Sequence, residues 1–259
     1  MKFSRSIVSR LLAGCVVLAS ASIAQQSEDN PDVTFVRANT AFENRDFVEA
    51  ERLYRKLITS GQVAEDVFFN LGNSVARQGR DGEAALWFHR ARVLDPRMPE
   101  ANQNLAFLEK KHGLLKVERD GLEAFLQAIK PSEITAVIAI GWWIFGLALA
   151  ATIVIRRLRD WRPLMIIVAL FGLGLALAAM WGEKKRTADL AIENFGIIIG
   201  EGVAARTAPG PNAEEVISLP PGSEVEILQK RGPTTYVSIP GELRGFVDSE
   251  HVKQIWPID

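Results

Sequence analysis

The residue types that carry most enzymatic chemistry are scarce in this chain of 259 residues. It contains one cysteine, Cys15, and three histidines that stand far apart: His89, His112 and His251. None of them falls in an HxH or HExxH spacing, so a zinc site or a serine–histidine triad has too few candidates. A carboxylate pair such as Glu201 and Glu224 is the remaining enzymatic option, but scattered surface acids explain these residues more simply. We therefore expect no enzyme, no catalytic residue, no metal ligand and no cofactor.

Four asparagines offer a different chemistry, because an amide side chain both donates and accepts hydrogen bonds and can pair with a peptide backbone. They are Asn39, Asn70, Asn73 and Asn104. Their positions follow a 34-residue period in the surrounding sequence, so what they can bind depends on the elements that this period describes.

The 34-residue period is clearest in Glu65–Met98. This segment carries an aromatic, a Leu-Gly pair and further spaced landmarks: Phe68, Leu71, Gly72, Ala84, Phe88, Ala91 and Pro96. These landmarks resemble the tetratricopeptide repeat. Pro31–Ala64 repeats the scheme without the Leu-Gly pair, and Glu100–Lys111 fits a capping helix. The resemblance implies an all-α tetratricopeptide repeat domain over residues 31–118.

Tetratricopeptide arrays bind peptides along the concave face made by their first helices. The register places the four asparagines on that face, which implies a peptide-binding groove suited to a short segment. The alternative is that they are merely solvated polar positions. The lysines and arginines of a full carboxylate clamp are not in register, so capture of a C-terminal carboxylate is not expected.

Two apolar runs predict a transmembrane hairpin. The chain is 48% hydrophobic overall, but residues 134–155 and 164–181 contain no charged side chain. As helices they would span roughly 33 and 27 Å, which matches the hydrocarbon core of a bilayer. Neither run holds a group that could carry ions or protons, so we interpret them as an anchor rather than a transporter. The net charge of −1 argues against nucleic acid as a partner.

Small residues lie in both runs, Gly146 with Ala150 and Gly172 with Ala176, and allow close contact within the hairpin or with a partner. Just before the hairpin, residues 119–132 predict an amphipathic juxtamembrane helix. It either lies at the lipid interface or packs on the repeat domain.

The N-terminus has the composition of a secretory signal peptide. Basic residues precede the apolar Leu11–Ala19, and Ser22-Ile23-Ala24 fits a cleavage site, so removal of residues 1–24 is expected. Two alternatives stay open: lipidation of Cys15 within the lipobox-like Leu12-Ala13-Gly14-Cys15, or an uncleaved anchor.

Charges around the spans predict the orientation. The basic loop Arg156–Arg162 is expected in the cytoplasm, which puts the repeats and the C-terminal domain on the periplasmic side of the bacterial cytoplasmic (inner) membrane. Lys184-Lys185-Arg186, after the second span, favours the opposite side for the C-terminal domain.

Residues 193–259 change from helical to strand-like patterning. Five short runs are β-branched or alternating: Gly196–Gly200, Val203–Arg206, Ser223–Leu228, Tyr236–Ile239 and Gly245–Val247. With the turn Leu219-Pro220-Pro221-Gly222, they resemble the bacterial SH3-like domain. That resemblance implies a small all-β barrel that binds peptides or cell-wall material, or docks against its neighbours. Tyr236 and Phe246 could form a binding surface, but we expect them in the buried barrel core.

The order of signal peptide, short repeat array, two-span hairpin and SH3-like tail resembles the BatE group of Bacteroides aerotolerance proteins. The resemblance implies a multidomain membrane protein with protein partners, among them membrane proteins bearing von Willebrand factor A domains and a MoxR-type ATPase. We therefore expect a membrane-anchored protein–protein interaction scaffold or adaptor in the bacterial cell envelope, linked to stress or oxygen tolerance. The alternative is a peptidoglycan-binding envelope module that positions a cell-wall enzyme.

Overall fold

The computed structural model describes residues 30–117, 119, 121–154, 160–189, 194–210 and 212–258. The expectations for the signal peptide, for Cys15 and for the loop residues 155–159 lie outside the described residues. The chain divides into two units, the first ending at Gly79 and the second beginning at Arg80.

Residues 30–79, the described part of the first unit, form the helices α2 (Pro31–Glu43), α3 (Phe47–Thr59) and α4 (Glu65–Ala76). Side-chain caps start two of them. The Asn30 side chain accepts the backbone N–H of Asp32 at 2.9 Å, and the Asp46 side chain accepts that of Glu49 at 3.1 Å. Helix α3 packs against both α2 and α4, and its buried face carries Tyr54 at the centre of the unit.

The second unit begins with the paired helices α5 (Asp81–Leu94) and α6 (Pro99–His112), and α6 covers the segment expected as a capping helix. An ion cluster fixes the pair. The Asp81 carboxylate, at the start of α5, lies 2.5 Å from Lys111 Nζ and 2.6 Å from His112 Nε2 in the last turn of α6. An acid at a helix N-terminus and bases at a helix C-terminus also suit the two helix dipoles.

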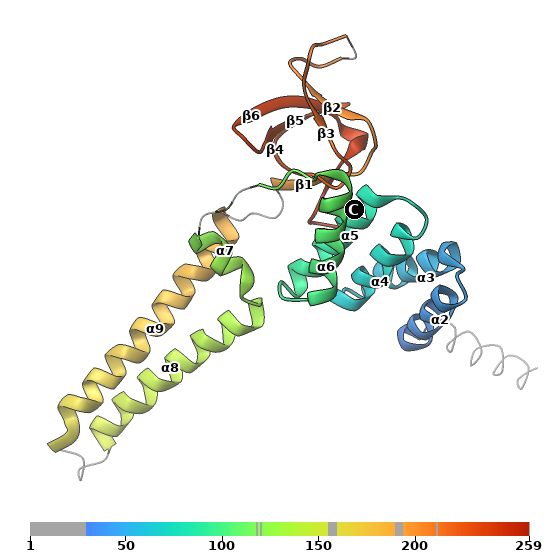
Figure 1. The fold of residues 1–259 in the computed structure, drawn as a ribbon. Helices are drawn as coiled ribbons and strands as arrows, with labels where there is room; N and C mark the ends of the chain where they lie inside the picture. Colours follow the sequence, from blue (N-terminus) through green and yellow to red (C-terminus); the bar gives the residue numbers. More distant parts are fainter. Residues whose placement is uncertain are drawn as a thin grey trace, which may run out of the picture. The chain divides into compact units, whose positions relative to one another are not determined.

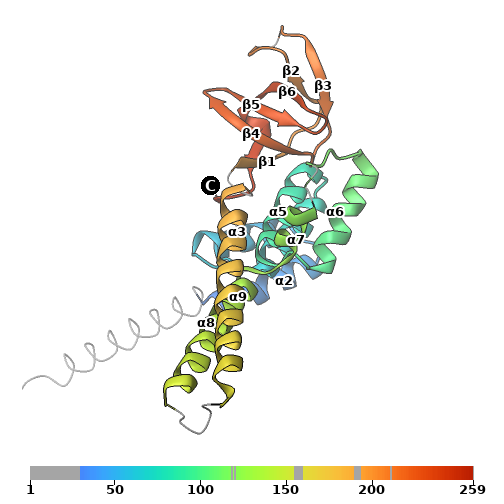
Figure 2. The same cartoon turned by 90° about the vertical axis from the view of Figure 1, so that its left-hand side faces the viewer.

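Helices α8 (Pro131–Val154) and α9 (Arg162–Asp189) form a hairpin, side by side in both views (Figures 1 and 2). Both are long and apolar enough to cross a membrane, over Ser132–Ile153 and Arg162–Lys185. They touch most closely at Gly141 and Gly172. A Cβ on Gly141 would lie 2.7 Å from the Ala176 nitrogen and 2.8 Å from the Gly172 oxygen. The expectation for Gly172 with Ala176 is therefore confirmed, whereas a Cβ on Gly146 would meet nothing within 4 Å.

Helix α7 (Gly121–Ala128) packs on α9. Leu126 is buried, and it lies against Gly182, while Phe125 on α7 is 61% exposed. This contact is with the second apolar helix and not with the repeat domain, and a place at the lipid interface stays a prediction.

Two ion pairs connect the end of α5 to the start of α8. Lys130 Nζ lies 2.6 Å from the Asp95 carboxylate, and the Arg97 guanidinium pairs with Glu133. The hairpin and the α5–α6 pair are thereby joined by charges as well as by the chain.

The C-terminal part is a small antiparallel sheet of seven strands. The strands are β1 (Phe195–Ile198), β2 (Val203–Arg206), β3 (Glu215–Leu219), β4 (Glu224–Arg231), β5 (Thr234–Ile239), β6 (Leu243–Asp248) and β7 (Val252–Gln254), with a 3₁₀ turn, η3 (Ser249–His251), before the last. Their order is β3-β2-β6-β5-β4-β1-β7 (Figure 1).

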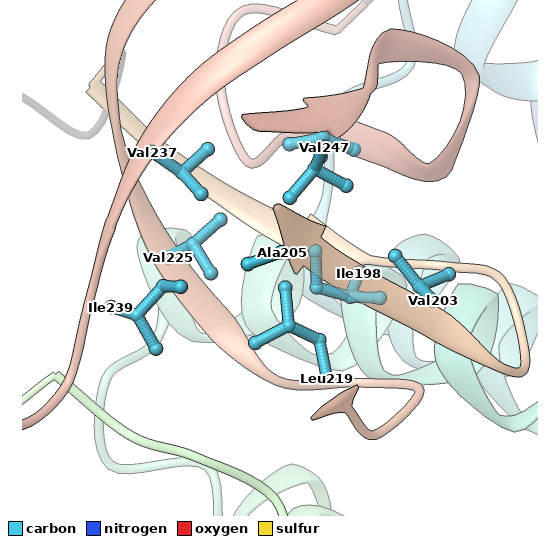
Figure 3. Close-up of a cluster of buried hydrophobic side chains, with 9 residues drawn as sticks. Ile198, Val203, Ala205, Leu219, Val225, Val237, Ile239 and Val247 are labelled. Carbon is cyan, nitrogen blue, oxygen red and sulfur yellow. The ribbon is translucent and has the colours of Figure 1, made fainter. Parts of the chain in front are cut away.

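The sheet curves around an aliphatic core (Figure 3). Its members come from alternate positions of the strands, as a two-residue side-chain period requires. They are Ile198, Val203, Ala205, Leu219, Val225, Val237, Ile239, Val247 and Val252. This core explains why the strands fold together, because a two-stranded hairpin alone would be marginal in water.

Helix α5 packs directly on β1 in the second unit (Figures 1 and 2). The close approach depends on Gly82, where an added Cβ would lie 2.7 Å from the Ile199 oxygen and 2.8 Å from the Ile198 oxygen. One turn beyond the middle of the helix, Arg90 is buried and donates to the backbone oxygens of Ile255 at 2.9 Å and Gln254 at 3.0 Å. Helix α5 is thus part of the same packed body as the sheet.

Candidate functional site

The first unit brings two of the four expected asparagines into contact. Asn39 on α2 accepts, through Oδ1, the hydroxyl of Tyr54 at 2.5 Å and the amide of Asn70 at 3.4 Å. Tyr54 comes from α3 and Asn70 from α4, so one polar cluster joins the three helices. Both asparagines are half-buried, whereas Tyr54 is 1% exposed.

Burial raises the pKa of Tyr54 to about 12, so its hydroxyl keeps its proton and acts as a donor at neutral pH. The Asn39 oxygen is therefore committed to Tyr54. What this residue can still offer a ligand is its NH₂ group, and Asn70 can still offer its carbonyl oxygen. One donor and one acceptor side by side match the alternating N–H and C=O groups of an extended peptide.

The other two asparagines have different positions. Asn73 lies on α4, one turn after Asn70, and is half-buried. Asn104 lies on α6 in the second unit.

Tyr54 was not among the residues expected in this site, although its hydroxyl bonds directly to Asn39. A buried tyrosine usually finds a partner for its hydroxyl. That rule could have pointed to Asn39, a polar residue on the neighbouring helix α2, as the partner of the Tyr54 hydroxyl.

The second surface of interest is an aromatic pair on the sheet. Tyr236 on β5 and Phe246 on β6 are paired residues whose ring centroids lie 4.7 Å apart, and the Arg231 guanidinium carbon lies 5.9 Å from the Phe246 ring. The expectation that both rings lie in the core is wrong. Their neighbours Val237 and Val247 fill the core, so strand alternation puts the two rings on the opposite face, where they are half-exposed.

Phe246 of this pair lines a small hollow of about 80 Å³, together with residues that include Arg206, Thr234 and Asp248. A half-exposed ring pair with an arginine beside it can stack on a planar or apolar group. Within the described ranges, no three His, Cys, Asp or Glu side chains gather in a way that could hold a metal ion.

The two surfaces therefore differ in chemistry. The asparagine cluster offers paired hydrogen-bonding groups, and the sheet offers an aromatic face with a cation beside it. Neither a protein-family model, nor a curated protein, nor a solved structure matches this chain.

Proposed function

We propose that this protein is a membrane-anchored adaptor of the bacterial cell envelope. In this proposal α2–α6 are a short tetratricopeptide array, the sheet is an SH3-like barrel, and α8 with α9 is the membrane anchor. The observation that carries the proposal is the contact of α5 with β1. Because the chain before the hairpin packs on the chain after it, both parts lie on one side of any bilayer that the two helices cross.

The side chains of the hairpin support an anchoring role. Large apolar residues point outward from it, such as Trp143 at 69%, Phe171 at 67% and Ile153 at 72% exposure. Water would penalise such a surface, whereas lipid tails would cover it. Between Ile134 and Ile153 and between Leu164 and Trp181 there is no ionisable side chain, so a route for ions is not supported.

The asparagine cluster supports recruitment of a peptide segment by the first unit. The resemblance to the BatE group suggests which segment: part of a membrane protein bearing a von Willebrand factor A domain, in an assembly with a MoxR-type ATPase linked to stress or oxygen tolerance. The site would then lie on the periplasmic side of the inner membrane, together with the sheet.

Site-specific photo-crosslinking in intact cells tests this function. Val36 lies on α2 one turn before Asn39 and is 62% exposed, and Val48 on α3 is 68% exposed and serves as the matched control. A crosslinker at Val36 should give a defined adduct that disappears when Asn39→Ala and Asn70→Ala are combined. Equal adducts from Val36 and Val48, or an adduct that survives the double substitution, would contradict the proposal.

The aromatic face of the sheet favours a second candidate function, a peptidoglycan-binding module that positions a cell-wall enzyme. The full chain in detergent should then be retained on purified peptidoglycan, and Phe246→Ala should abolish retention. Leu243→Ala is the matched control, since Leu243 lies on the same strand and is 38% exposed. Equal retention of both variants would remove this candidate.

A further inference from the structure

A cavity of about 250 Å³ lies within the second unit, between α5, α6, residues 114–119 and the start of β4. At about 30 Å³ for each molecule of liquid water, it has room for about eight waters or one small organic molecule. Its wall combines apolar and charged groups. The residues that carry the argument are His89, Arg92, Leu115, Lys116, Arg119 and Glu224.

The wall is built by segments that are firmly held. The backbone N–H of Leu115 donates to Ser223 Oγ at 3.1 Å, and the Leu115 oxygen accepts the N–H of Glu224 at 2.9 Å. Residues 114–116 thus run along the beginning of β4. Gly222 has a φ of +94°, which favours glycine, and an added Cβ would lie 3.0 Å from Ala85 and 3.1 Å from Leu114.

Of the lining residues that the structure describes, Arg92, Lys116 and Arg119 are cationic, and Glu224 is anionic. Arg119 is paired with Glu224 through both terminal nitrogens, and Lys116 is paired with Glu109. Arg92 is different. Among the described residues no hydrogen bond or ion pair reaches its guanidinium, and its Nε is fully buried.

Other polar groups in the wall also favour an anion in the cavity. The Arg119 Nε is also buried without a hydrogen-bond acceptor. Burial is the largest cause that lowers the pKa of His89 to about 4; Glu224 opposes it, and Arg92, Arg119 and Lys116 add to it, so His89 is uncharged at neutral pH. Burial likewise lowers the pKa of Arg92, with Arg119 adding to the effect and Glu224 opposing it. An arginine whose buried Nε–H meets no acceptor among the described residues is costly, and an anion in the cavity would offset that cost.

The geometry points to a binding site for a small anion that carries a phosphate or carboxylate group, with Arg92 as its main ligand and the Arg119 Nε–H and the neutral His89 ring beside it. Guanidinium groups pair with these anions through two parallel hydrogen bonds, which fits a planar or tetrahedral oxyanion better than chloride. The site is independent of the proposed adaptor function, because it uses neither the asparagine cluster nor the aromatic face.

Calorimetric titration of the full chain in nanodiscs of neutral lipid tests the site, with inorganic phosphate and succinate as probes. One of the two probes should bind saturably at one site of the natural chain. Its affinity for Arg92→Met should be at least tenfold lower, since loss of a charge-assisted hydrogen bond has about that effect. Its affinity for Arg37→Met should be unchanged. Arg37 is an exposed arginine on α2 and is the matched control. If neither probe binds saturably, or if Arg92→Met binds as the natural chain does, the site does not exist.

Thermal unfolding without added anion guards against a folding defect. Arg92→Met should unfold at the same temperature as the natural chain or higher, because it removes an uncompensated buried charge. A clearly lower temperature would show that Arg92 has a structural partner, and would overturn the proposal.

The source of the anion is settled by repeating the titration in nanodiscs that contain anionic phospholipid. Unchanged binding of the probe assigns the site to a soluble molecule. If anionic phospholipid lowers the probe affinity of the natural chain to that of Arg92→Met, the site binds a lipid headgroup.

Discussion

Replacing Gly82 by alanine should loosen the contact between α5 and the sheet. The new methyl carbon would lie 2.7 Å from the Ile199 oxygen, about 0.7 Å closer than the ordinary limit of 3.4 Å. It would also lie 2.8 Å from the Ile198 oxygen, which already accepts the N–H of Gly222. Both neighbours are backbone atoms held in hydrogen bonds, so the helix has to move rather than a side chain.

The expected cost is about 1–3 kcal/mol, the usual range for forcing a methyl group into a packed interior. Alanine's better helix propensity offsets less than about 1 kcal/mol of this. Hydrogen exchange of the full chain, followed by mass spectrometry, should show faster exchange in peptides covering residues 195–200 and 220–224. The unfolding temperature should fall by about 2–4 °C for each kcal/mol lost.

The matched control is Gly121→Ala, at the start of α7, where an added Cβ meets nothing within 4 Å. It should leave the exchange of both peptides unchanged. If Gly82→Ala exchanges like the control and unfolds at the same temperature, then α5 does not rest on β1 as described. The proposal that the parts of the chain before and after the hairpin lie on the same side of a bilayer would then lose its support.

Three further results are expected. Gly141→Ala should lower the thermal stability of the hairpin in detergent by about 1–3 kcal/mol, while Gly146→Ala should leave it unchanged or higher; equal effects would contradict the crossing point. Tyr54→Phe should cost about 1 kcal/mol in denaturant unfolding, because Asn39 loses its donor; no change would show that this hydrogen bond is unimportant. Burial raises the pKa of Asp81, but hydrogen bonds from Lys111 and His112 on α6 outweigh burial, so the net pKa is lowered. The contact of Asp81 with these two residues therefore contributes stability above about pH 4 that is lost as the pH falls through the lowered pKa. Asp81→Asn should abolish this loss in acid titrations followed by circular dichroism.

Element types were largely predictable because periodicity is a local property of the sequence. The segment expected as a capping helix, Glu100–Lys111, is α6 (Pro99–His112), and the runs at 134–155 and 164–181 lie in the two apolar helices. The five expected strand runs correspond to β1, β2, β4, β5 and β6. Whether the helices are tetratricopeptide repeats and the sheet an SH3-like barrel stays a proposal.

Two strands were missed, each for a physical reason. β3 (Glu215–Leu219) is an edge strand in which only Leu219 is buried, so it lacks the alternation that marks a strand with one buried face. β7 (Val252–Gln254) has three residues, too few to show any period, and its place is set by pairing with β1.

The charged cavity could not be predicted from the sequence. Arg92 and Arg119 are 27 positions apart, and Glu224 follows after a further 105, so no local spacing relates them. Nor does the sequence indicate that, among the described residues, no hydrogen-bond acceptor would reach the buried Nε of Arg92. The asparagines were found because a repeat period can be read along the chain, whereas their use of Tyr54 depends on how three helices meet.

The contact between Arg90 and residues 254–255 spans 164 positions of the chain, with both apolar helices between its two ends. A ribosome therefore completes α5 long before the strands that cover it exist. In that interval Gly82 and Arg90 lack the strand backbone that they contact in the folded protein, and the two apolar helices are made before the sheet. We therefore expect that other proteins shield the α5 face during synthesis, or that the sheet forms slowly as the last step of folding.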